Sequence, residues 1–330
     1  MSARALPFAL ALVAMALVPL VSTSPFYVNL TSQVAIAAIG ALGLNVLVGH
    51  AGLNSLGFAV FPGLAAYLVA WLSTVGGFDP VPAGLLALAG TLLVSAGFAL
   101  VALRTTGLGF VMITMALCQI VWGAAYRWTS VTGGDNGLSG IARPGAGLGL
   151  ERPEVFLWLC LCVLALALLQ LGRFFDSPLG VALRGSRDQP RRMNAVGYDV
   201  WRIRFVAWML AAAWGAAAGL LYAWYHQFVS PHMMAVTASA EVLLMVVAGG
   251  AGTLAGPLVG AALVVLLKNL ASIWIERWVM LLGFTFVVIV LVVPDGIVPG
   301  LGRLKGALKR MRPASGPTIS KLVPREGADG

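Results

Sequence analysis

Few residues in this chain have the types and the spacing that chemistry requires. The cysteines lie in apolar runs rather than in C-x-x-C or Cys/His metal spacing, and the histidines are scattered, although the last two flank one loop: Cys118, Cys160, Cys162, His50, His226 and His232. No G-x-x-x-x-G-K-S/T motif is present to cradle nucleotide phosphates, and no acidic pair or Ser/His/Asp arrangement has catalytic spacing. The sequence therefore predicts that the chain is not an enzyme, holds no metal and binds no cofactor. Any ATP on which it depends would be hydrolysed by a separate subunit.

Recognition of a polar solute among apolar residues is a second kind of chemistry, and it has four candidate residues. Glu241 precedes the apolar run 242–247. A charge at the centre of a bilayer costs about 2.5 to 3.5 kcal/mol, so such residues are usually functional. Asn45, Ser55 and Gln119 are the other candidates for a substrate pathway. The alternatives are that Glu241 lies at a helix end in water, and that these side chains only make interhelical hydrogen bonds worth roughly 0.6 kcal/mol each.

Two glycine-rich stretches interrupt apolar runs, one in each half of the chain, at 49–57 and 249–257. Backbone that leaves the helix at membrane depth must line a water-filled cavity or be buried in protein, because lipid cannot satisfy its N–H and C=O groups. Paired interruptions mark the substrate path in secondary transporters. We therefore expect these glycines to line a cavity, with two ordinary interfacial turns as the alternative: Gly49, Gly52, Gly57, Gly249, Gly250 and Gly252.

Apolar helices are the elements that position these residues. With 60% hydrophobic and 10% charged residues and a mean hydropathy of +0.93, the chain is far more apolar than the roughly 45 to 50% of a soluble domain. Runs that approach the roughly 20 residues needed to cross a bilayer follow one another: 5–22, 32–49, 56–75, 81–103, 109–126, 155–172, 203–225, 237–249, 255–271 and 278–293. This predicts an all-α, polytopic membrane helix bundle of about ten transmembrane helices. There are eight full crossings if 237–249 and 255–271 form a broken hairpin, and the first run could instead be a signal peptide.

The formal charge of +9 is unevenly distributed. Of 21 Lys and Arg residues, seven lie between 173 and 204 and seven between 303 and 325. Basic residues collect in cytoplasmic loops, so we expect both regions and the N-terminus, with Arg4, to be cytoplasmic. Nucleic acid is an unsuitable partner because no aromatic residues interleave with these charges. The chain would then comprise a transmembrane domain, 1–300, in contact with the lipid bilayer, and a disordered basic cytoplasmic tail, 301–330.

The segment 177–197 is too polar to cross a bilayer and carries the signals of a short cytoplasmic helix. Ser177 is a suitable N-cap and Pro178 stands at the first helical position, where its missing N–H has no cost. Pro190 should end or kink the helix, and Gly197 suits the C-terminal stop. Apolar residues, Leu179 included, share one face and charged residues another, and the residues expected to couple the chain to a partner are Ala182, Leu183, Arg184, Arg187 and Asp188. The arginines could also anchor the loop to anionic lipid headgroups, at about 1 kcal/mol each.

Five stretches, in order, resemble one family of transporters. They are the first glycine-rich stretch from 43 to 57, a loop at 132–141, the segment 180–197, the glycine-rich region 241–260 and the closing run 293–297. Together they resemble the permease subunit of the branched-chain amino acid (leucine, isoleucine and valine) ABC importers over about residues 38 to 300. The resemblance implies a bacterial inner-membrane subunit that pairs with a second homologous permease and forms the translocation path with it. It further implies two ATPase subunits that use ATP, and a periplasmic substrate-binding protein.

Two departures from that family's pattern leave the partner and the substrate open. An acidic, alanine-rich continuation is replaced by 189–193, and Phe58 stands where the family has histidine. Related permeases carry urea, short amides or other small acids as well as branched-chain amino acids. The alternative from another class is a self-sufficient secondary transporter or channel for small polar solutes, which would not need an ATPase.

Overall fold

The computed structural model describes residues 25–145 and 150–274, together with residues 15, 280, 283–285, 287–288, 291 and 296–300. Along the chain the elements are α2 (Pro25–Asn45), the π-helix η1 (Val46–Ala51), α3 (Val60–Thr74), α4 (Pro80–Ala102), α5 (Leu108–Arg127), α6 (Thr129–Thr132), the 3-10 helix η2 (Gly134–Asn136), β1 (Leu138–Ser139), α7 (Pro153–Asp176), α8 (Pro178–Asp188), α9 (Pro190–Ala195), α10 (Val200–His226), β2 (Phe228–Val229), the 3-10 helix η3 (Pro231–Met234), α11 (Val236–Gly249) and α12 (Gly256–Trp274).

The predicted all-α membrane bundle is confirmed. In the described part of the chain, five helices are long and apolar enough to cross a membrane, with 20 to 27 residues each, and three shorter apolar helices accompany them. A helix of 27 residues is about 40 Å long at 1.5 Å per residue, which exceeds a hydrocarbon core of about 30 Å. Each of the eight predicted spans from 32–49 to 255–271 coincides with one of these helices. Of the predicted span 5–22 only residue 15 is described, and of the predicted span 278–293 only residues 280, 283–285, 287–288 and 291 are. The tail 301–330 lies entirely outside the described residues.

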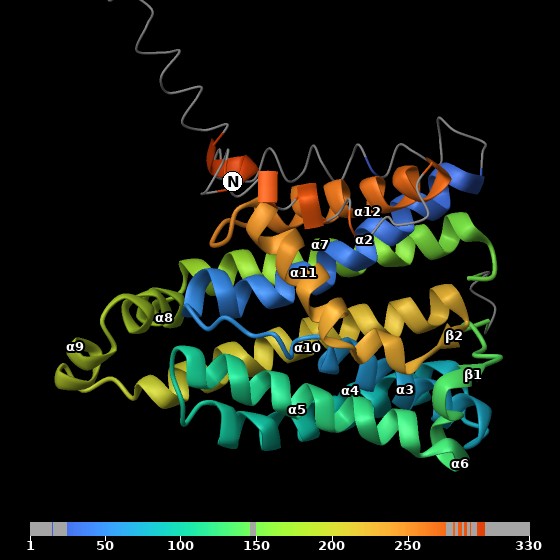
Figure 1. Ribbon diagram of the computed structural model, residues 1–330, viewed down its shortest axis with the longest axis horizontal. Coiled ribbons are helices and arrows are strands. Elements are labelled where there is room, and N and C mark those ends of the chain that lie inside the picture. The colour runs from blue at the N-terminus through green and yellow to red at the C-terminus, as the bar shows by residue number, and fades with distance from the viewer. Residues whose placement is uncertain are drawn as a thin grey trace, which may run out of the picture.

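Two long helices, α2 and α10, form the centre of the bundle. Helix α10 packs against α2, α3 and α4, and α2 packs against α7, α11 and α12 (Figure 1). Helices α4 and α5 lie at the periphery, where Leu93 and Leu108 are 76% and 80% exposed. Apolar side chains with that exposure are stable in lipid and would be costly in water, so this face suits a hydrocarbon environment.

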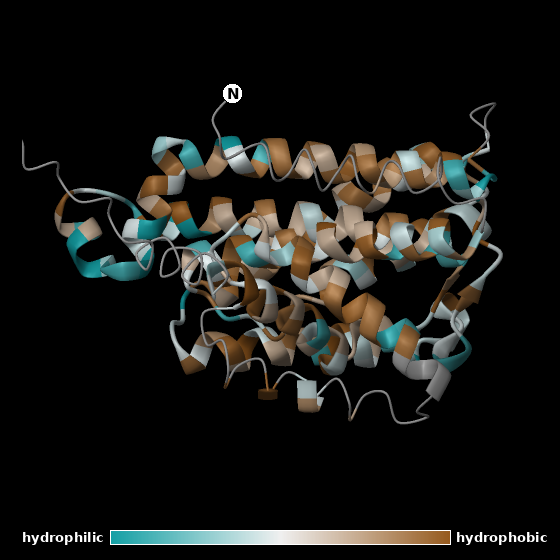
Figure 2. Ribbon diagram, turned by 90° about the horizontal axis from the view of Figure 1, so that it is seen from above, coloured by the Kyte–Doolittle hydropathy of each residue, from teal (hydrophilic) through white to brown (hydrophobic). Residues whose placement is uncertain are grey.

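The bundle has two chemically distinct ends. Helices α8 and α9 project from one end, here called the α8 end, and β1, β2 and α6 lie at the opposite end, the β end (Figure 1). Strands β1 and β2 pair antiparallel with Leu138 opposite Val229, a small sheet that the apolar pattern did not predict. Hydrophilic residues are concentrated toward the two ends and apolar residues cover the middle (Figure 2). This is the distribution expected of helices that cross a bilayer from end to end.

Candidate functional site

Helix α8 forms as its sequence predicts. Ser177 accepts a hydrogen bond from the backbone N–H of Gly180 at 3.3 Å, and Pro178 is the first helical residue. Its inner face buries Ala182 and Leu183. Leu179 was expected on that face but is 49% exposed, because at the start of the helix its side chain points away from the bundle. The outer face of α8 is therefore partly apolar.

Arg187 joins α8 to the first glycine-rich stretch. Its Nη1 donates a hydrogen bond to the carbonyl oxygen of Gly49, 138 residues away in the chain. A Cβ on Gly52 would lie 2.7 Å from the Arg187 side chain, so only glycine leaves room for the arginine. Helix α8 is also bonded to α10, since Arg204 Nη2 of α10 donates to the carbonyl oxygen of Ser186 at 3.0 Å. Helix α8 is therefore bonded directly to η1.

Asn45 joins the two glycine-rich stretches to each other. Its side chain is fully buried, with Oδ1 accepting from the backbone N–H of Gly252 and Nδ2 donating to the carbonyl oxygen of Thr253, both at 2.9 Å. We call this pair of bonds the Asn45 clamp. It lies where α2 widens into the π-helix η1, and such bulges are frequent at functional sites. Through Arg187, Gly49 and the clamp, α8 is connected to the junction of α11 and α12.

The six predicted glycines have two structural roles at these junctions. Three have positive φ, at +68°, +118° and +82°, a conformation that glycine adopts without cost: Gly52, Gly250 and Gly252. The other three permit backbone contact, since an added Cβ would meet the backbone of Gly252, Thr114 and Gly256 respectively: Gly49, Gly57 and Gly249. These glycines thus pack protein against protein, while the cavity described below is lined by other residues.

Helices α3 and α11 both begin inside the bundle, and their first turns meet. The backbone N–H of Ala59 donates to Ser239 Oγ at 3.0 Å. Just before α11, Cys118 Sγ in the middle of α5 donates to the carbonyl oxygen of Met234 at 3.1 Å. The chain thus re-enters the bundle after β2 and continues as α11 to the α8 end, and α12 then packs against α11. The two interruptions are opposite in direction: irregular chain lies toward the α8 end before α3 and toward the β end before α11.

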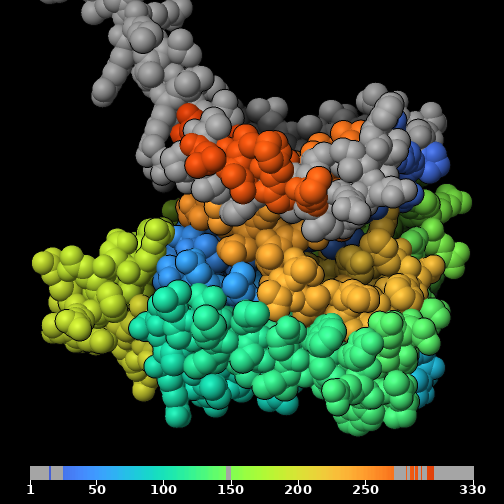
Figure 3. All heavy atoms as spheres, viewed as in Figure 1, coloured from blue at the N-terminus to red at the C-terminus, as the bar shows by residue number. Residues whose placement is uncertain are grey.

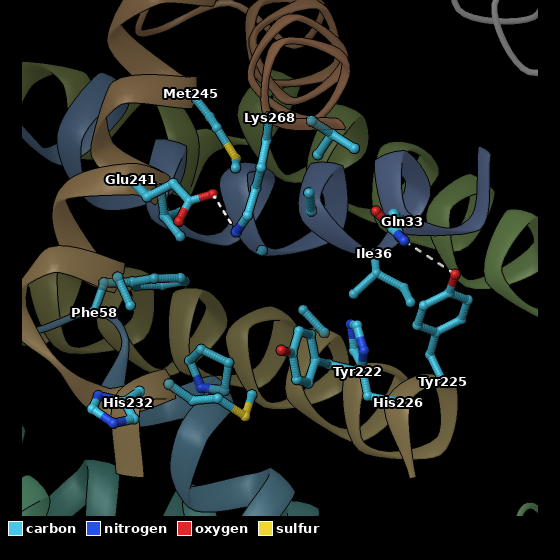
Figure 4. A pocket seen from close by; sticks show the side chains of 18 of the residues that line it. Gln33, Ile36, Phe58, Tyr222, Tyr225, His226, His232, Glu241, Met245 and Lys268 are labelled. Atoms are coloured by element: carbon cyan, nitrogen blue, oxygen red, sulfur yellow. Dashed lines mark hydrogen bonds and ion pairs between the residues drawn. The ribbon is translucent and has the colours of Figure 1, made fainter. Parts of the chain in front are cut away.

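A cavity of about 390 Å³ lies between α2, α10, α11 and α12, toward the β end. One wall carries Glu241 of α11 and Lys268 of α12, and Glu241 Oε1 lies 3.4 Å from Lys268 Nζ. The rings of Tyr222 and His226, from the last turns of α10, lie across the cavity (Figure 4). The remaining lining is largely apolar and includes Ile36, Ala37, Phe58, Met245 and Val265. A charged pair facing aromatic and aliphatic walls can bind a small solute that has both polar and apolar parts.

Comparison with known proteins decides the family. Residues 26–293 match the family described as the permease component of branched-chain amino acid transport systems. The chain belongs to this family. It is 31% identical to the high-affinity branched-chain amino acid transport system permease protein LivM of Salmonella typhimurium, over 298 residues that cover 82% of this chain and 70% of the relative. It is 30% identical, with the same coverage, to LivM of Escherichia coli. No solved structure matches the chain.

Family membership confirms the resemblance carried by the five sequence stretches. Together with the apolar helices, it identifies this permease homologue as a multi-pass membrane protein.

Of the four polar residues predicted to line a substrate path, Glu241 is in the cavity. Asn45 is in the clamp, and Ser55 is buried, where its Oγ accepts from the backbone N–H of Gly57 at 3.3 Å. Gln119 is exposed on α5. The structure therefore places the four residues at four different locations.

Sequence reasoning missed Lys268 and the tyrosines of α10. Lys268 could have been found, because it is the only lysine before residue 300 and falls inside the apolar run 255–271, where an ionisable residue indicates function. Tyr222 and Tyr225 had no such signal. Only the packing of α10 beside α2, where Tyr225 Oη accepts from Gln33 Nε2 at 3.1 Å, brings them to the cavity.

Proposed function

We propose that this chain is a permease subunit of an ATP-driven importer for branched-chain or related small amino acids in the bacterial inner membrane. It would form the translocation path with a second homologous permease, receive substrate from a periplasmic binding protein, and be driven by two ATPase subunits. The names of its relatives support the substrate class. The chain itself has no phosphate-binding motif, so the ATPase partners would supply the hydrolysis.

The connection from α8 to both glycine-rich stretches is the observation that carries this proposal. A permease without its own motor needs a rigid element that receives force and passes it to the gate. Helix α8 projects from the body of the molecule, and the end of α2 lies beside it (Figure 3). Its exposed residues Leu179, Arg184 and Asp188 offer a mixed apolar and charged surface to an ATPase. Arg187 and the Asn45 clamp then pass the displacement to the junctions of α2 with α3 and of α11 with α12.

The charge distribution sets the orientation of this mechanism. Helices α8 and α9 carry Arg184, Arg187, Arg191 and Arg192, so the positive-inside rule assigns the α8 end to the cytoplasm. The basic residues near the two termini, Arg4 and the seven between 303 and 325, favour the same side by the same rule. The cavity lies toward the opposite, periplasmic end. The proposed transporter thus has a cavity that accepts substrate from outside and a clamp that closes its cytoplasmic side.

Reconstitution of the chain with its partner subunits in liposomes tests the proposal. Uptake of labelled leucine should require both the binding protein and ATP on the α8 side. Uptake at full rate by the chain alone, without ATP, would instead identify a secondary transporter or channel.

A charge reversal tests the coupling role of α8 in the same system. Arg184→Glu should abolish the stimulation of ATP hydrolysis by loaded binding protein, because the exposed guanidinium lies on the docking face. Arg104→Glu, at an exposed position between α4 and α5 and away from α8, is the matched control and should leave stimulation unchanged. Equal stimulation in the wild type and Arg184→Glu would remove α8 from the coupling mechanism.

A further inference from the structure

The ion pair between Glu241 and Lys268 lies on the wall of a cavity rather than in a packed interface. The Glu241 side chain is 24% exposed and that of Lys268 is 45% exposed, and both line the space between α10, α11 and α12. A partly exposed ion pair contributes only about 0 to 1 kcal/mol to stability. The charges at this position therefore add little to the stability of the fold, whereas a ligand with charges of its own would need them.

The pair has the charge pattern of one particular class of ligand. An amino acid at neutral pH carries an ammonium and a carboxylate on the same carbon atom, so its two charges lie as close together as those of a single ion pair. The ammonium suits Glu241, which accepts hydrogen bonds only, and the carboxylate suits Lys268, whose ammonium has three donors and can hold several acceptors at once.

The rest of the cavity suits an aliphatic side chain. Ile36 of α2, Met245 of α11 and Val265 of α12 contribute apolar surface to the lining. A volume of about 390 Å³ is near the lower end of the range of roughly 300 to 1,000 Å³ for small-molecule pockets. It is large enough for a single small amino acid.

We propose that this single permease chain contains an amino acid site, in which Glu241 holds the ammonium group, Lys268 holds the carboxylate and the aliphatic lining selects the side chain. The site deepens the proposed function and rests on it for the substrate class. All the residues that line it belong to this one chain.

Protection from chemical labelling tests this site on the full chain in lipid nanodiscs. Ala37→Cys places a thiol on the cavity wall, in a Cys162→Ser background because Cys118 and Cys160 are buried. L-leucine should slow labelling of this thiol by a small methanethiosulfonate reagent. Ala195→Cys, exposed on α9, should be labelled equally fast with and without leucine.

The charged residues are tested in the same assay. Glu241→Gln or Lys268→Gln should raise the leucine concentration that gives half protection by about 10- to 100-fold, the effect of losing one hydrogen bond to a charged group. Glu154→Gln, the same change at an exposed position of α7, should have no effect. Two leucine analogues are compared in the protein with Glu241 and Lys268 unchanged: 4-methylpentanoate lacks the ammonium, and 3-methylbutylamine lacks the carboxylate. Each should protect only at much higher concentrations than leucine.

Several results would overturn the proposal. One is an absence of protection by leucine at Ala37→Cys, and another is an absence of labelling there while Ala195→Cys reacts. Equal protection by leucine and both analogues would show a merely apolar cavity. The analogue comparison needs no change at Glu241 or Lys268, so it decides the question even if those variants fail to fold. Protection without ATP-dependent uptake would reject the importer and keep the site. ATP-dependent uptake without protection would keep the importer and reject the site.

Discussion

Removal of the Asn45 side chain should loosen the junction between α11 and α12. In Asn45→Ala both bonds of the clamp are lost, to the N–H of Gly252 and to the carbonyl of Thr253. At about 1 kcal/mol for a typical hydrogen bond, the loss is about 2 kcal/mol, or roughly a 30-fold increase in the opening equilibrium. The lower values measured between membrane helices, about 0.6 kcal/mol each, still give about 1.2 kcal/mol and roughly an 8-fold increase.

Amide hydrogen exchange measures this opening directly, because the Gly252 N–H is itself one of the bonded groups. We expect exchange in a peptide covering 249–256 to be about 8- to 30-fold faster in Asn45→Ala than in the wild type. Asn54→Ala is the matched control, since it removes the same side chain from an exposed position of the same glycine-rich stretch. A change of less than about twofold, which corresponds to under 0.5 kcal/mol, would refute the clamp, and so would an equal change in both variants.

Two further predictions concern packing. Trp208→Phe should destabilise the chain by about 1 to 3 kcal/mol, because Trp208 Nε1 donates to Ser95 Oγ at 2.9 Å and to the Ser95 carbonyl oxygen at 3.0 Å. Trp214→Phe, which removes a buried Nε1 without a partner, should be neutral or stabilising. Thermal unfolding in detergent compares them, and equal losses would contradict the reasoning. Gly260→Ala should prevent normal folding, since its Cβ would meet the Met245 carbonyl oxygen, whereas Gly97→Ala faces open space; size-exclusion profiles that show both variants equally monodisperse would rule out this tight contact.

Helix positions and the shape of α8 could be predicted because their causes are local. Lipid forces every spanning segment to satisfy its own backbone, so the apolar runs mark the helices, and Ser177 with Pro178 marks the start of α8. Contacts between distant parts of the chain could not be predicted in this way. The bond from Arg187 to Gly49 joins residues 138 apart, and the clamp joins residues 207 apart.

Hydropathy also could not predict where the interrupted helices begin. An apolar run shows that a segment is buried but not where its helix begins, so the predicted span 56–75 gave no sign that α3 starts at Val60 inside the bundle. Gln119 shows another limit, because the sequence reveals a polar residue in an apolar helix but not that it lies on the exposed side of α5.

The irregular chain between η1 and α3 has a consequence for how the protein tolerates insertions and deletions. Outside a helix, each residue can advance the chain by about 3.3 to 3.6 Å, against 1.5 Å within one. Both ends of the stretch are tied, at Gly49 by Arg187 and at Ala59 by Ser239. Loss of one residue would therefore shorten the reach of this tied stretch by up to about 3.6 Å, against about 1.5 Å for the same loss within a helix. The number of residues in this short stretch is thus as strictly specified as their identity.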